Sequence, residues 1–376
     1  MDFRLYFKSR QSELVNFLKK IVILESPTGD KKAVDACSAM VGTEFKKAGA
    51  RIVRIPQKDI GDFHIVEYAP PFLPKDAGQI LVLAHVDTVW PVGKITRMPF
   101  YISGEKIYGP GVLDMKAGIV MAFSALAAID KLNIKPQSKI VFFINSAEET
   151  GSGAAHDWIR KLAKKSSAVL CLEPAMPGGA LKVERKGRVV IRLDVKGKAA
   201  HGGSPEKGVS AVEELVSQLT RLKKIRVRET TVNIGIIGGG EKANVVPEGA
   251  WAILDIRFWK RLDRDKVMTY FRELEPVLSG AKLKFSVESS TPPMEKTMAS
   301  AGLFERAGKI ASSLDISLRE GKSGGGSDAS IASDAGAPTL DGLGPEGDGI
   351  HADHEHLRLP SFLERTALLT ELLSRL

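Results

Sequence analysis

The chain has 376 residues, which is long for a single hydrophobic core, so we expect one large domain and a second, smaller one. Hydrophobic residues make up 43% and charged residues 26%, as in globular proteins and unlike disordered or fibrous ones. No apolar run approaches the roughly 18 residues of a membrane span, and charges interrupt residues 1–20, where a secretory signal has its apolar core. We therefore expect a cytoplasmic protein with no membrane partner.

The net charge is +9, from 54 lysines and arginines against 45 aspartates and glutamates. The basic residues are scattered along the chain, and the densest cluster, residues 223–228 (KKIRVR), has no aromatic residues that could stack on bases. This pattern is typical of a solvated basic surface and argues against a nucleic-acid partner. A positive field also attracts small anionic molecules.

The first part of the chain alternates helical patterns with strand patterns. Residues 79–85 (QILVLAH) and 139–145 (KIVFFIN) are almost continuously apolar, as in strands that are covered on both faces. The other expected elements are helices over residues 12–24, 30–50, 114–132 and 156–165, and strands over 50–55, 63–69 and 166–173. This alternation predicts a doubly wound α/β domain with a mostly parallel sheet.

The pattern changes near Gly178 and Gly179. Residues 180–200 alternate apolar and polar side chains around a Lys-Gly pair, which predicts an antiparallel hairpin. The elements expected after it are a helix over 205–222, strands over 230–237 and 249–259, a helix over 263–278 and a strand over 281–289. Such an order is typical of a four-stranded antiparallel α+β module of the ferredoxin-like kind.

The α/β pattern resumes after the segment TPPM, residues 291–294. It continues with the glycine-rich loop SGGGSDAS (323–330), a strand over 337–343 and a final helix over 360–376. We therefore expect a catalytic domain formed by residues 1–178 and 291–376. The smaller domain, residues 179–290, is inserted into it.

Metal-binding side chains follow several of the apolar strands. The candidates are His85, Asp87, Glu148, Glu149, Glu173, Asp114 at a loop-to-helix boundary, and His351. Each carboxylate alone is more readily explained as a solvated loop residue. Ligands of open α/β sheets bind outside the carboxyl ends of the strands, however, so these side chains should converge. Histidine and carboxylate ligands without thiolates favour zinc, with cobalt or manganese as alternatives.

The number of candidates favours two ions rather than one. Two histidines and three acids exceed the needs of one tetrahedral ion and fit two ions that share a bridging carboxylate. Asp87 lies two residues after His85, so in a strand both side chains point to one side and Asp87 could accept the second N–H of the imidazole. The alternative is that HVDT is only a strand end leading into a turn.

At this point the sequence resembles a known family. The segments LAHVDTVWPVGKITRMPFYISGEKIYGPGVLDMKAG, AEETGS, LEP, GKAAHGGSPEKGVSA and HADHEHL occur in the order found in co-catalytic zinc amidohydrolases. These include glutamate carboxypeptidases, acetylornithine deacetylases, succinyl-diaminopimelate desuccinylases and aminoacylases. The resemblance covers nearly the whole chain and implies a catalytic domain, a lid domain that dimerises, and hence a homodimer.

The resemblance also implies a role for each motif residue. It assigns His85 and Glu173 to the first zinc, Glu149 and His351 to the second, Asp114 to the bridge between them, Asp87 to the support of His85, and Glu148 to general base catalysis. A cis peptide is expected after Asp114. His354 and His356 lie beyond the matching position, and we expect them to be surface residues.

In the smaller domain, His201 lies in a polar, glycine-rich turn and by sequence alone reads as an exposed loop histidine. The resemblance implies that it reaches the partner's site and stabilises an oxyanion. Asn244 and Arg257 match positions that bind the substrate's oxygens and free carboxylate, although Arg257 is also explained as a cross-strand charge. The resemblance further implies that backbone N–H groups of Gly325 and Gly326 meet a carboxylate.

The predicted reaction is hydrolysis of an amide bond. Paired metal ions lower the pKa of water towards ~7, and Glu148 moves its proton to the leaving nitrogen. The motifs look most like the glutamate carboxypeptidase branch, so the expected substrate is a small peptide or N-acyl amino acid that loses a C-terminal, acidic residue. An N-acyl-amino-acid deacylase, a dipeptidase and a binding protein without turnover are the alternatives. A dinucleotide enzyme is disfavoured because no GxGxxG follows the first strand.

Overall fold

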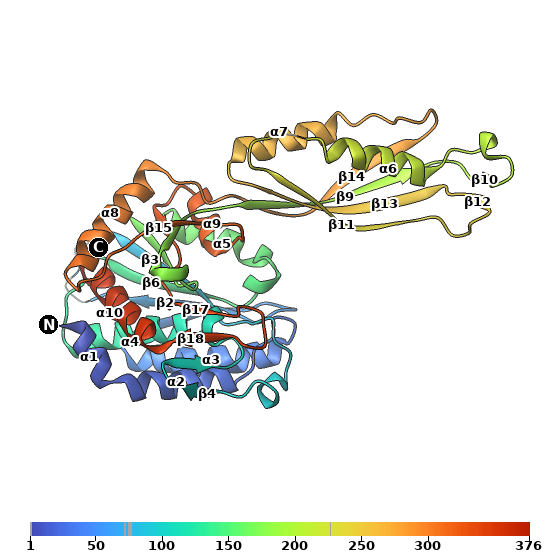
Figure 1. Cartoon of the computed structure of the whole chain (residues 1–376). Coiled ribbons are helices and arrows are strands. Elements are labelled where there is room, and N and C mark those ends of the chain that lie inside the picture. Colours follow the sequence, from blue (N-terminus) through green and yellow to red (C-terminus); the bar gives the residue numbers. More distant parts are fainter. Residues whose placement is uncertain (1, 71–72, 74–76, 226) are drawn as a thin grey trace. The chain divides into compact units, whose positions relative to one another are not determined.

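Figure 1 shows the computed structural model of the chain, which describes residues 2–70, 73, 77–225 and 227–376. The chain forms two compact units. Unit 1 comprises Met1–Val183, Lys296–Lys322 and Ser327–Leu376, and unit 2 comprises Glu184–Glu295 and Ser323–Gly326. Unit 2 thus includes four residues of the glycine-rich loop, which the sequence assigns to the larger domain.

Unit 1 is built on a six-stranded mixed sheet. The strand order is β1 (Arg51–Ile55), β2 (Phe63–Tyr68), β6 (Lys139–Asn145), β3 (Gln79–His85), β7 (Ala168–Cys171) and β16 (Thr339–Leu340). Strands β6, β3, β7 and β16 run parallel, whereas β1 and β2 pair antiparallel at one edge. The predicted α/β fold with a mostly parallel sheet is confirmed.

Helices cover this sheet. They are α1 (Phe3–Ser9), α2 (Gln11–Ile23), α3 (Lys31–Lys47), α4 (Ala117–Lys131), α5 (His156–Ala163), α8 (Met298–Ser312), α9 (Asp328–Asp334) and α10 (Leu359–Arg375). Helix α4 packs on β3, α2, α3 and α10, while α5 and α9 pack together and α9 contacts β7. Because helices shield the central strands, every residue of β7 and six of the seven in β3 are buried.

The most apolar helix lies at the centre of unit 1. The segment Val112–Lys131, which contains α4, is long and apolar enough to cross a membrane, but 89% of its apolar window is buried inside the protein. It is therefore the core helix of unit 1. The helix begins at Ala117 rather than at Asp114, because an irregular turn, Val112–Lys116, precedes it. The expected cis peptide between Asp114 and Met115 is confirmed.

A small antiparallel sheet joins the first segment of unit 1, Met1–Val183, to its last segment, Ser327–Leu376. Its strands lie in the order β17 (Gly347–Asp348), β18 (His356–Arg358), β5 (Lys106–Tyr108) and β4 (Tyr101–Ser103). Strand β18 comes from the C-terminal part of the chain and pairs with β5, with His356 opposite Tyr108. This pairing places the loop that carries His351 beside the turn that carries Asp114.

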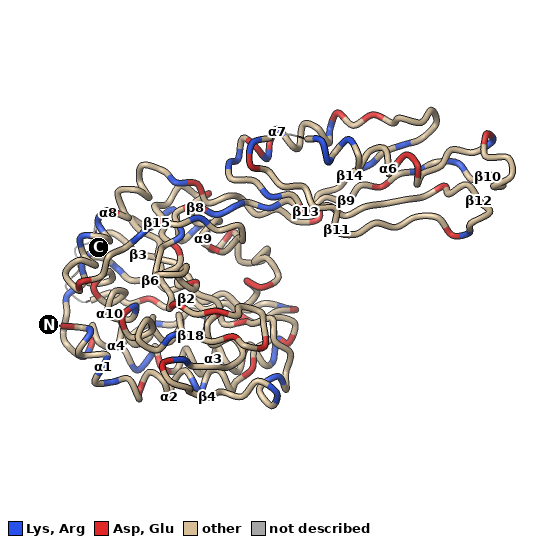
Figure 2. Tube along the Cα trace, viewed as in Figure 1, with Lys and Arg blue, Asp and Glu red and all other residues tan. Residues whose placement is uncertain are grey.

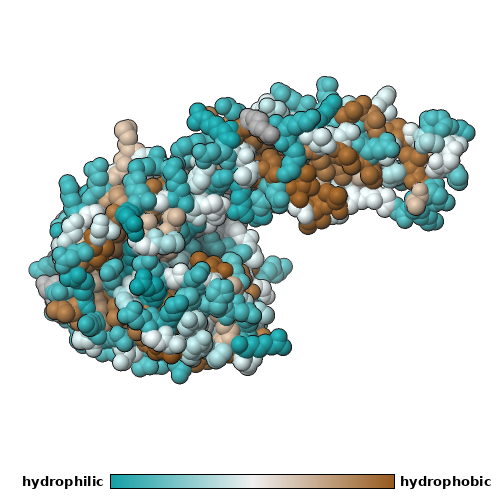
Figure 3. Space-filling model, viewed as in Figure 1, coloured by the Kyte–Doolittle hydropathy of each residue, from teal (hydrophilic) through white to brown (hydrophobic). Residues whose placement is uncertain are grey.

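Unit 2 is an antiparallel sheet with two helices. The strand order is β11 (Thr231–Gly239), β13 (Gly249–Phe258), β9 (Gly187–Lys196) and β14 (Lys282–Thr291), and the helices are α6 (Ala211–Leu222) and α7 (Arg261–Arg272). Alternate residues of β9 and β13 form a core with these helices. The predicted ferredoxin-like α+β order is confirmed. Figure 3 shows hydrophobic residues also gathered over the strands of this sheet.

One predicted element is wrong. Residues 180–200 do not form a hairpin, because β8 (Leu181–Arg185) pairs with β15 (Glu320–Ser323) and β9 lies between β13 and β14. Close packing explains the glycine of the Lys-Gly pair, since a Cβ on Gly187 would lie 2.4 Å from Phe258 and 2.6 Å from the Pro293 nitrogen. Periodicity identified both strands but not their partners.

Basic residues occur on both units with acidic residues among them, as Figure 2 shows. In unit 2, for example, the basic side chains of Arg188 and Arg257 both bond to Asp255. Many of the charges are thus balanced locally by an acidic neighbour.

Candidate metal centre

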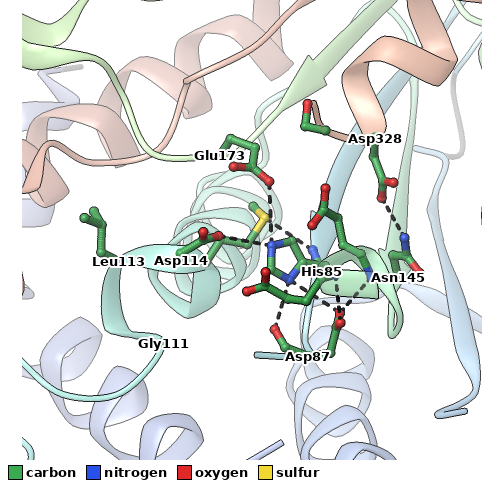
Figure 4. Close-up of polar contacts among 12 residues, drawn as sticks. His85, Asp87, Gly111, Leu113, Asp114, Asn145, Glu173 and Asp328 are labelled. Atoms are coloured by element: carbon green, nitrogen blue, oxygen red, sulfur yellow. Dashed lines mark hydrogen bonds and ion pairs between the residues drawn. The ribbon is translucent and has the colours of Figure 1, made fainter. Parts of the chain in front are cut away.

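His85 lies at the carboxyl end of β3, where the sheet delivers its imidazole into a cluster of acids. The side chain is almost fully buried, and its Nε2 lies 3.1 Å from Asp114 Oδ1 and 3.6 Å from Glu173 Oε1. Glu173 follows β7, the neighbouring parallel strand, and Asp114 lies on the turn before α4. Figure 4 shows both carboxylates directed at the imidazole.

A second histidine approaches the same cluster from the other side. His351 Nε2 lies 3.1 Å from Glu149 Oε2 and 3.5 Å from Asp114 Oδ2. The two oxygens of Asp114 therefore face the two histidines separately. This is the geometry that a bridging carboxylate requires.

The two glutamates of NSAEET occupy different parts of this cluster. Ligand atoms of His85, Glu148 and Glu173 lie within 4.8 Å of one another, as do those of His85, Asp114 and Glu149. Glu149 also contacts His351. The short helical turn Glu148–Thr150 thus presents one carboxylate toward Glu173 and the other toward His351.

The donor set fits divalent metal ions. Glu149 Oε1 is buried without a hydrogen-bond partner among the described residues, and a buried carboxylate oxygen of this kind is stabilised by a cation. Burial, together with the nearby Glu173 carboxylate, raises the pKa of Glu148 well above its ordinary value. Hydrogen bonds to Asp114 and Glu149 raise the pKa of His351 to about 10. A cluster of several buried carboxylates is stabilised either by protonation of its members or by bound metal cations.

Asp87 supports the centre differently from the sequence expectation. His85 Nδ1 lies 2.9 Å from the backbone oxygen of Asp87 and 3.4 Å from its carboxylate, so the carbonyl is the nearer acceptor. The carboxylate instead accepts the backbone N–H groups of Glu148 and Glu149, each at 3.2 Å, and the Thr28 hydroxyl at 2.8 Å. Asp87 therefore connects the end of β3 to the glutamate turn, which its spacing from His85 did not reveal.

A buried polar network that the sequence did not indicate also holds this turn. Asn145 Oδ1 accepts the N–H groups of Ser146 and Ala147, and its Nδ2 donates to Ser152 and Asp328, both at 2.8 Å. Burial raises the pKa of Asp328 to about 6, although the hydrogen bonds that Ser152 and Asn145 donate to its carboxylate act to lower this pKa. The sequence signal was the polar residue at the end of β6, Asn145, but nothing in the sequence indicated Asp328 as its partner.

The candidates of the smaller domain lie in unit 2. His201 is exposed on the short strand β10 (Ala200–His201), which pairs with β12 (Val245–Val246). The N–H of Gly202 donates to the Asn244 carbonyl at 2.7 Å, so His201 and Asn244 lie close together. The Gly203 N–H donates to His201 Nδ1 at 3.0 Å. This bond leaves the proton of the neutral imidazole on Nε2, where it can be donated.

Arg257 makes two contacts within unit 2, and substrate binding by this residue remains a prediction. Its Nε pairs with Asp255 at 3.1 Å within β13, as a strand charge would. Its Nη1 donates to the carbonyl of Gly324 at 2.8 Å. Arg185 Nη1 donates to the carbonyls of Gly325 and Gly326 at 3.0 and 2.9 Å. Arginines thus hold the glycine-rich loop through its carbonyl oxygens.

The two histidines after His351 differ from each other. His354 is exposed, as expected. The expectation of a surface position for His356 is wrong, because this residue is buried in β18, where its ring lies 5.0 Å from that of Tyr108. Strand pairing with β5 explains the burial, which a motif match could not anticipate.

Known proteins resemble the chain along most of its length. The profile of peptidase family M20/M25/M40 matches residues 81–375. The chain is 28% identical over 352 residues to carboxypeptidase G2 of Pseudomonas sp. (strain RS-16), covering 91% of this chain and 84% of that protein. It is 28% identical over 321 residues to a succinyl-diaminopimelate desuccinylase of Methylorubrum extorquens (strain PA1), covering 78% and 81%.

A solved structure shares the fold. Aminopeptidase PepT from Bacillus cereus ATCC 10987 matches with a TM-score of 0.79 at 22% identity, covering 97% of this chain and 98% of that one. Identity at this level supports the architecture only.

Proposed function

The chain belongs to peptidase family M20/M25/M40, and from this premise we propose that it is a two-zinc carboxypeptidase that releases a C-terminal, preferably acidic, residue. The observation that carries the proposal is the position of Asp114, whose two oxygens face His85 and His351 at 3.1 and 3.5 Å. We assign His85 and Glu173 to one ion, Glu149 and His351 to the other, and Asp114 to both. Cobalt or manganese are alternative metals.

When bound, the metal ions supply Lewis-acid activation of water and of the scissile carbonyl. Glu148 takes a proton from the attacking water on its carboxylate and delivers it to the leaving nitrogen. Asp87 and Asn145 keep this carboxylate in place by binding the backbone on either side of it. His201 donates from Nε2 to the oxyanion, because Gly203 occupies its Nδ1.

Substrate preference is assigned to the arginines of unit 2. We propose that Arg257 binds the free carboxylate of the substrate through N–H groups not used by Asp255 and Gly324. Asn244 and the backbone of Gly325 and Gly326 complete the binding of the substrate's oxygens. The similarity to carboxypeptidase G2 supports a C-terminal residue as the leaving group. The similarity to a succinyl-diaminopimelate desuccinylase keeps N-acyl-amino-acid deacylation as a second candidate.

The test is a substrate panel with metal-reconstituted protein. N-acyl-glutamates, N-acyl-lysines, dipeptides and N-succinyl or N-acetyl diamino acids would be compared by kcat/KM with zinc, cobalt and manganese. We expect N-acyl-glutamates to rank first and chelation to abolish turnover. A preference for N-acetylornithine or free-amino dipeptides over N-acyl-glutamates would reject the carboxypeptidase assignment and select the second candidate or a dipeptidase.

We further propose that unit 2 mediates a homodimer. Strand β11 is an edge strand of its sheet, and Ile236 and Ile237 on it are 53% and 63% exposed. Exposed apolar side chains on an open edge favour pairing with a second chain. Light scattering coupled to size exclusion should give twice the mass of 40.7 kDa, and Ile237→Lys should shift the protein toward the monomer. A monomeric wild-type protein at micromolar concentration would contradict this.

A further inference from the structure

Glu355 is a fully buried carboxylate that the proposed reaction does not use. Its Oε1 accepts the backbone N–H groups of Leu113 and Asp114 at 2.9 and 3.1 Å. Its Oε2 accepts the Trp90 indole N–H at 2.8 Å and the Gly111 N–H at 2.9 Å. Four N–H donors converge on one side chain and satisfy both of its oxygens.

Three of these donors belong to the turn that presents Asp114. This turn has an irregular backbone, with non-helical dihedral angles at Asp114 and Met115, so its N–H groups are not bonded as in a regular helix. Figure 4 shows Gly111 and Leu113 on the ribbon that leads to Asp114. A buried N–H without an acceptor is costly, so Glu355 stabilises this particular course of the turn.

The same residue is part of the loop that presents His351. The Glu355 N–H donates to the Ala352 carbonyl at 2.9 Å, and the Ala352 N–H donates to the Gly349 carbonyl at 2.8 Å. His351 lies between Gly349 and Ala352 and has a φ of 61°. A left-handed backbone is uncommon for histidine and is held only where surrounding bonds determine it. Glu355 therefore lies close to His351 along the chain and is hydrogen-bonded to the turn that carries Asp114.

The other end of the cluster does not depend on Glu355. His85 ends a strand inside the sheet, and Glu173 follows a strand that pairs with it, Leu83 opposite Cys171. The Leu172 N–H continues this ladder by donating to the Leu83 carbonyl at 3.0 Å. Sheet hydrogen bonds thus fix the relative positions of the two strand ends that carry these side chains.

We propose that Glu355 is a positioning residue that sets the distance between Asp114 and His351, and so controls the affinity of the Glu149–His351 metal position more strongly than that of the His85–Glu173 position. Glu355 itself touches no ligand atom of the cluster. The inference rests on the proposed two-metal function. It assigns the distance between Asp114 and His351 to one buried carboxylate and the distance between His85 and Glu173 to the main sheet. Asp114 is shared by both positions, so part of any change at the turn reaches the second position.

The test is Glu355→Gln in metal-free protein titrated with Co²⁺ alone, followed by calorimetry and visible absorption. Glutamine keeps the shape but replaces one acceptor oxygen with an NH₂ group that faces two N–H donors. We expect one site to weaken by roughly 10–100-fold, the usual effect of removing a group that orients a metal ligand. The other site depends on this turn only through Asp114, so it should weaken by a smaller factor.

The matched control is Glu346→Gln. Glu346 also accepts a backbone N–H, from Gly178 at 2.9 Å, but it does not bond the turn of Asp114. Both cobalt affinities should remain at wild-type values in this variant. Equal weakening of both sites in Glu355→Gln, or no weakening, would overturn the proposal, whereas a wild-type protein that binds no pair of ions would instead reject the proposed function.

If Glu355→Gln does not fold, Trp90→Phe is a second variant that tests the same proposal. It removes one of the four donors and keeps an aromatic ring beneath Lys94, whose Nζ lies 4.5 Å from the ring centroid. The same site should weaken, by a smaller factor than in Glu355→Gln. If both sites kept wild-type affinity in Trp90→Phe while Glu355→Gln was unfolded, Glu355 would be a folding residue only and the proposal would be rejected.

Discussion

The two units present their candidate side chains in opposite ways. In unit 1, His85 is buried at the end of β3 and Asp114 on the turn before α4, and His351 completes the cluster from an exposed loop position. In unit 2, His201 is exposed on a two-residue strand and is oriented by a bond to Gly203. Most of the candidate metal ligands are thus held by the core, whereas side chains that meet a substrate must remain accessible to it.

This contrast separates the expected effects of mutation. Changes in unit 1 should alter metal content or stability together with activity, because the site and the core share hydrogen bonds. Changes at the candidates of unit 2 should alter activity alone, because few buried contacts depend on them.

The largest effect is expected for Glu148→Gln. Loss of the general base should lower kcat by about 10²–10⁴-fold, while elemental analysis still finds two metal ions per chain. Glu149→Gln is the matched control, since it should lose one ion. If Glu148→Gln lost a metal and Glu149→Gln kept both, the two roles would be reversed.

The second largest effect on activity is expected for His201→Ala. Removing a donor to an oxyanion lowers kcat by about 10²–10³-fold in comparable sites. Because His201 is exposed, the melting temperature and metal content should not change. His354→Ala, at another exposed histidine, is the control for loss of an imidazole. A kcat close to wild type in His201→Ala would remove this residue from the mechanism.

Arg257→Ala should act mainly on KM. Hydrogen bonds to a charged group contribute about 1.5–3 kcal/mol, which corresponds to a rise in KM of about 10–100-fold for N-acyl-glutamates. Arg188→Ala is the control, since Arg188 shares Asp255 with Arg257. Equal effects of the two variants would indicate that the shared ion pair matters, rather than a bond from Arg257 to substrate.

The smallest effect is expected outside the candidate metal ligands, at Asp62 of unit 1. Burial opposes its ionisation, but hydrogen bonds from Lys31, the Gln57 N–H and Arg54 hold the pKa of Asp62 at about 2, below its usual 3.8. A depressed folded-state pKa stabilises the protein above the unfolded pKa, and this contribution is lost as the pH falls toward 2.

Asp62→Asn should therefore lower stability by about 1–2 kcal/mol at pH 7. The difference from wild type should shrink as melting is followed from pH 5 down to pH 2. At pH 7, kcat/KM should be unchanged. A constant difference at every pH would show that packing, rather than charge, is responsible.

Prediction from sequence succeeded where local pattern carries the information. The strands over residues 79–85 and 139–145 have the bounds that their apolar runs indicate. His85 therefore lies at a strand end, and sheet topology explains why Glu173 lies beside it. The interpretation failed for residues 180–200, because two strands adjacent in sequence pair with partners more than 50 residues away.

Other features of the centre depend on contacts between distant segments. Glu355 bonds to Leu113 and Asp114 across more than 240 residues, and Asn145 bonds to Asp328 across 183. No periodicity or spacing encodes such pairs. They form only when the first and last segments of unit 1, Met1–Val183 and Ser327–Leu376, pack into one core.

The sequence by itself determined the fold class, the family and the residues able to bind metal, because apolar periodicity and strand-end polarity are local properties of the chain. Tertiary structure alone decided what each of these residues contacts. It directed the carboxylate of Asp87 to the glutamate turn rather than chiefly to His85, and it set one oxygen of Asp114 toward each histidine. Hydrogen bonds are short and directional, so their partners are defined only once the backbone has been placed.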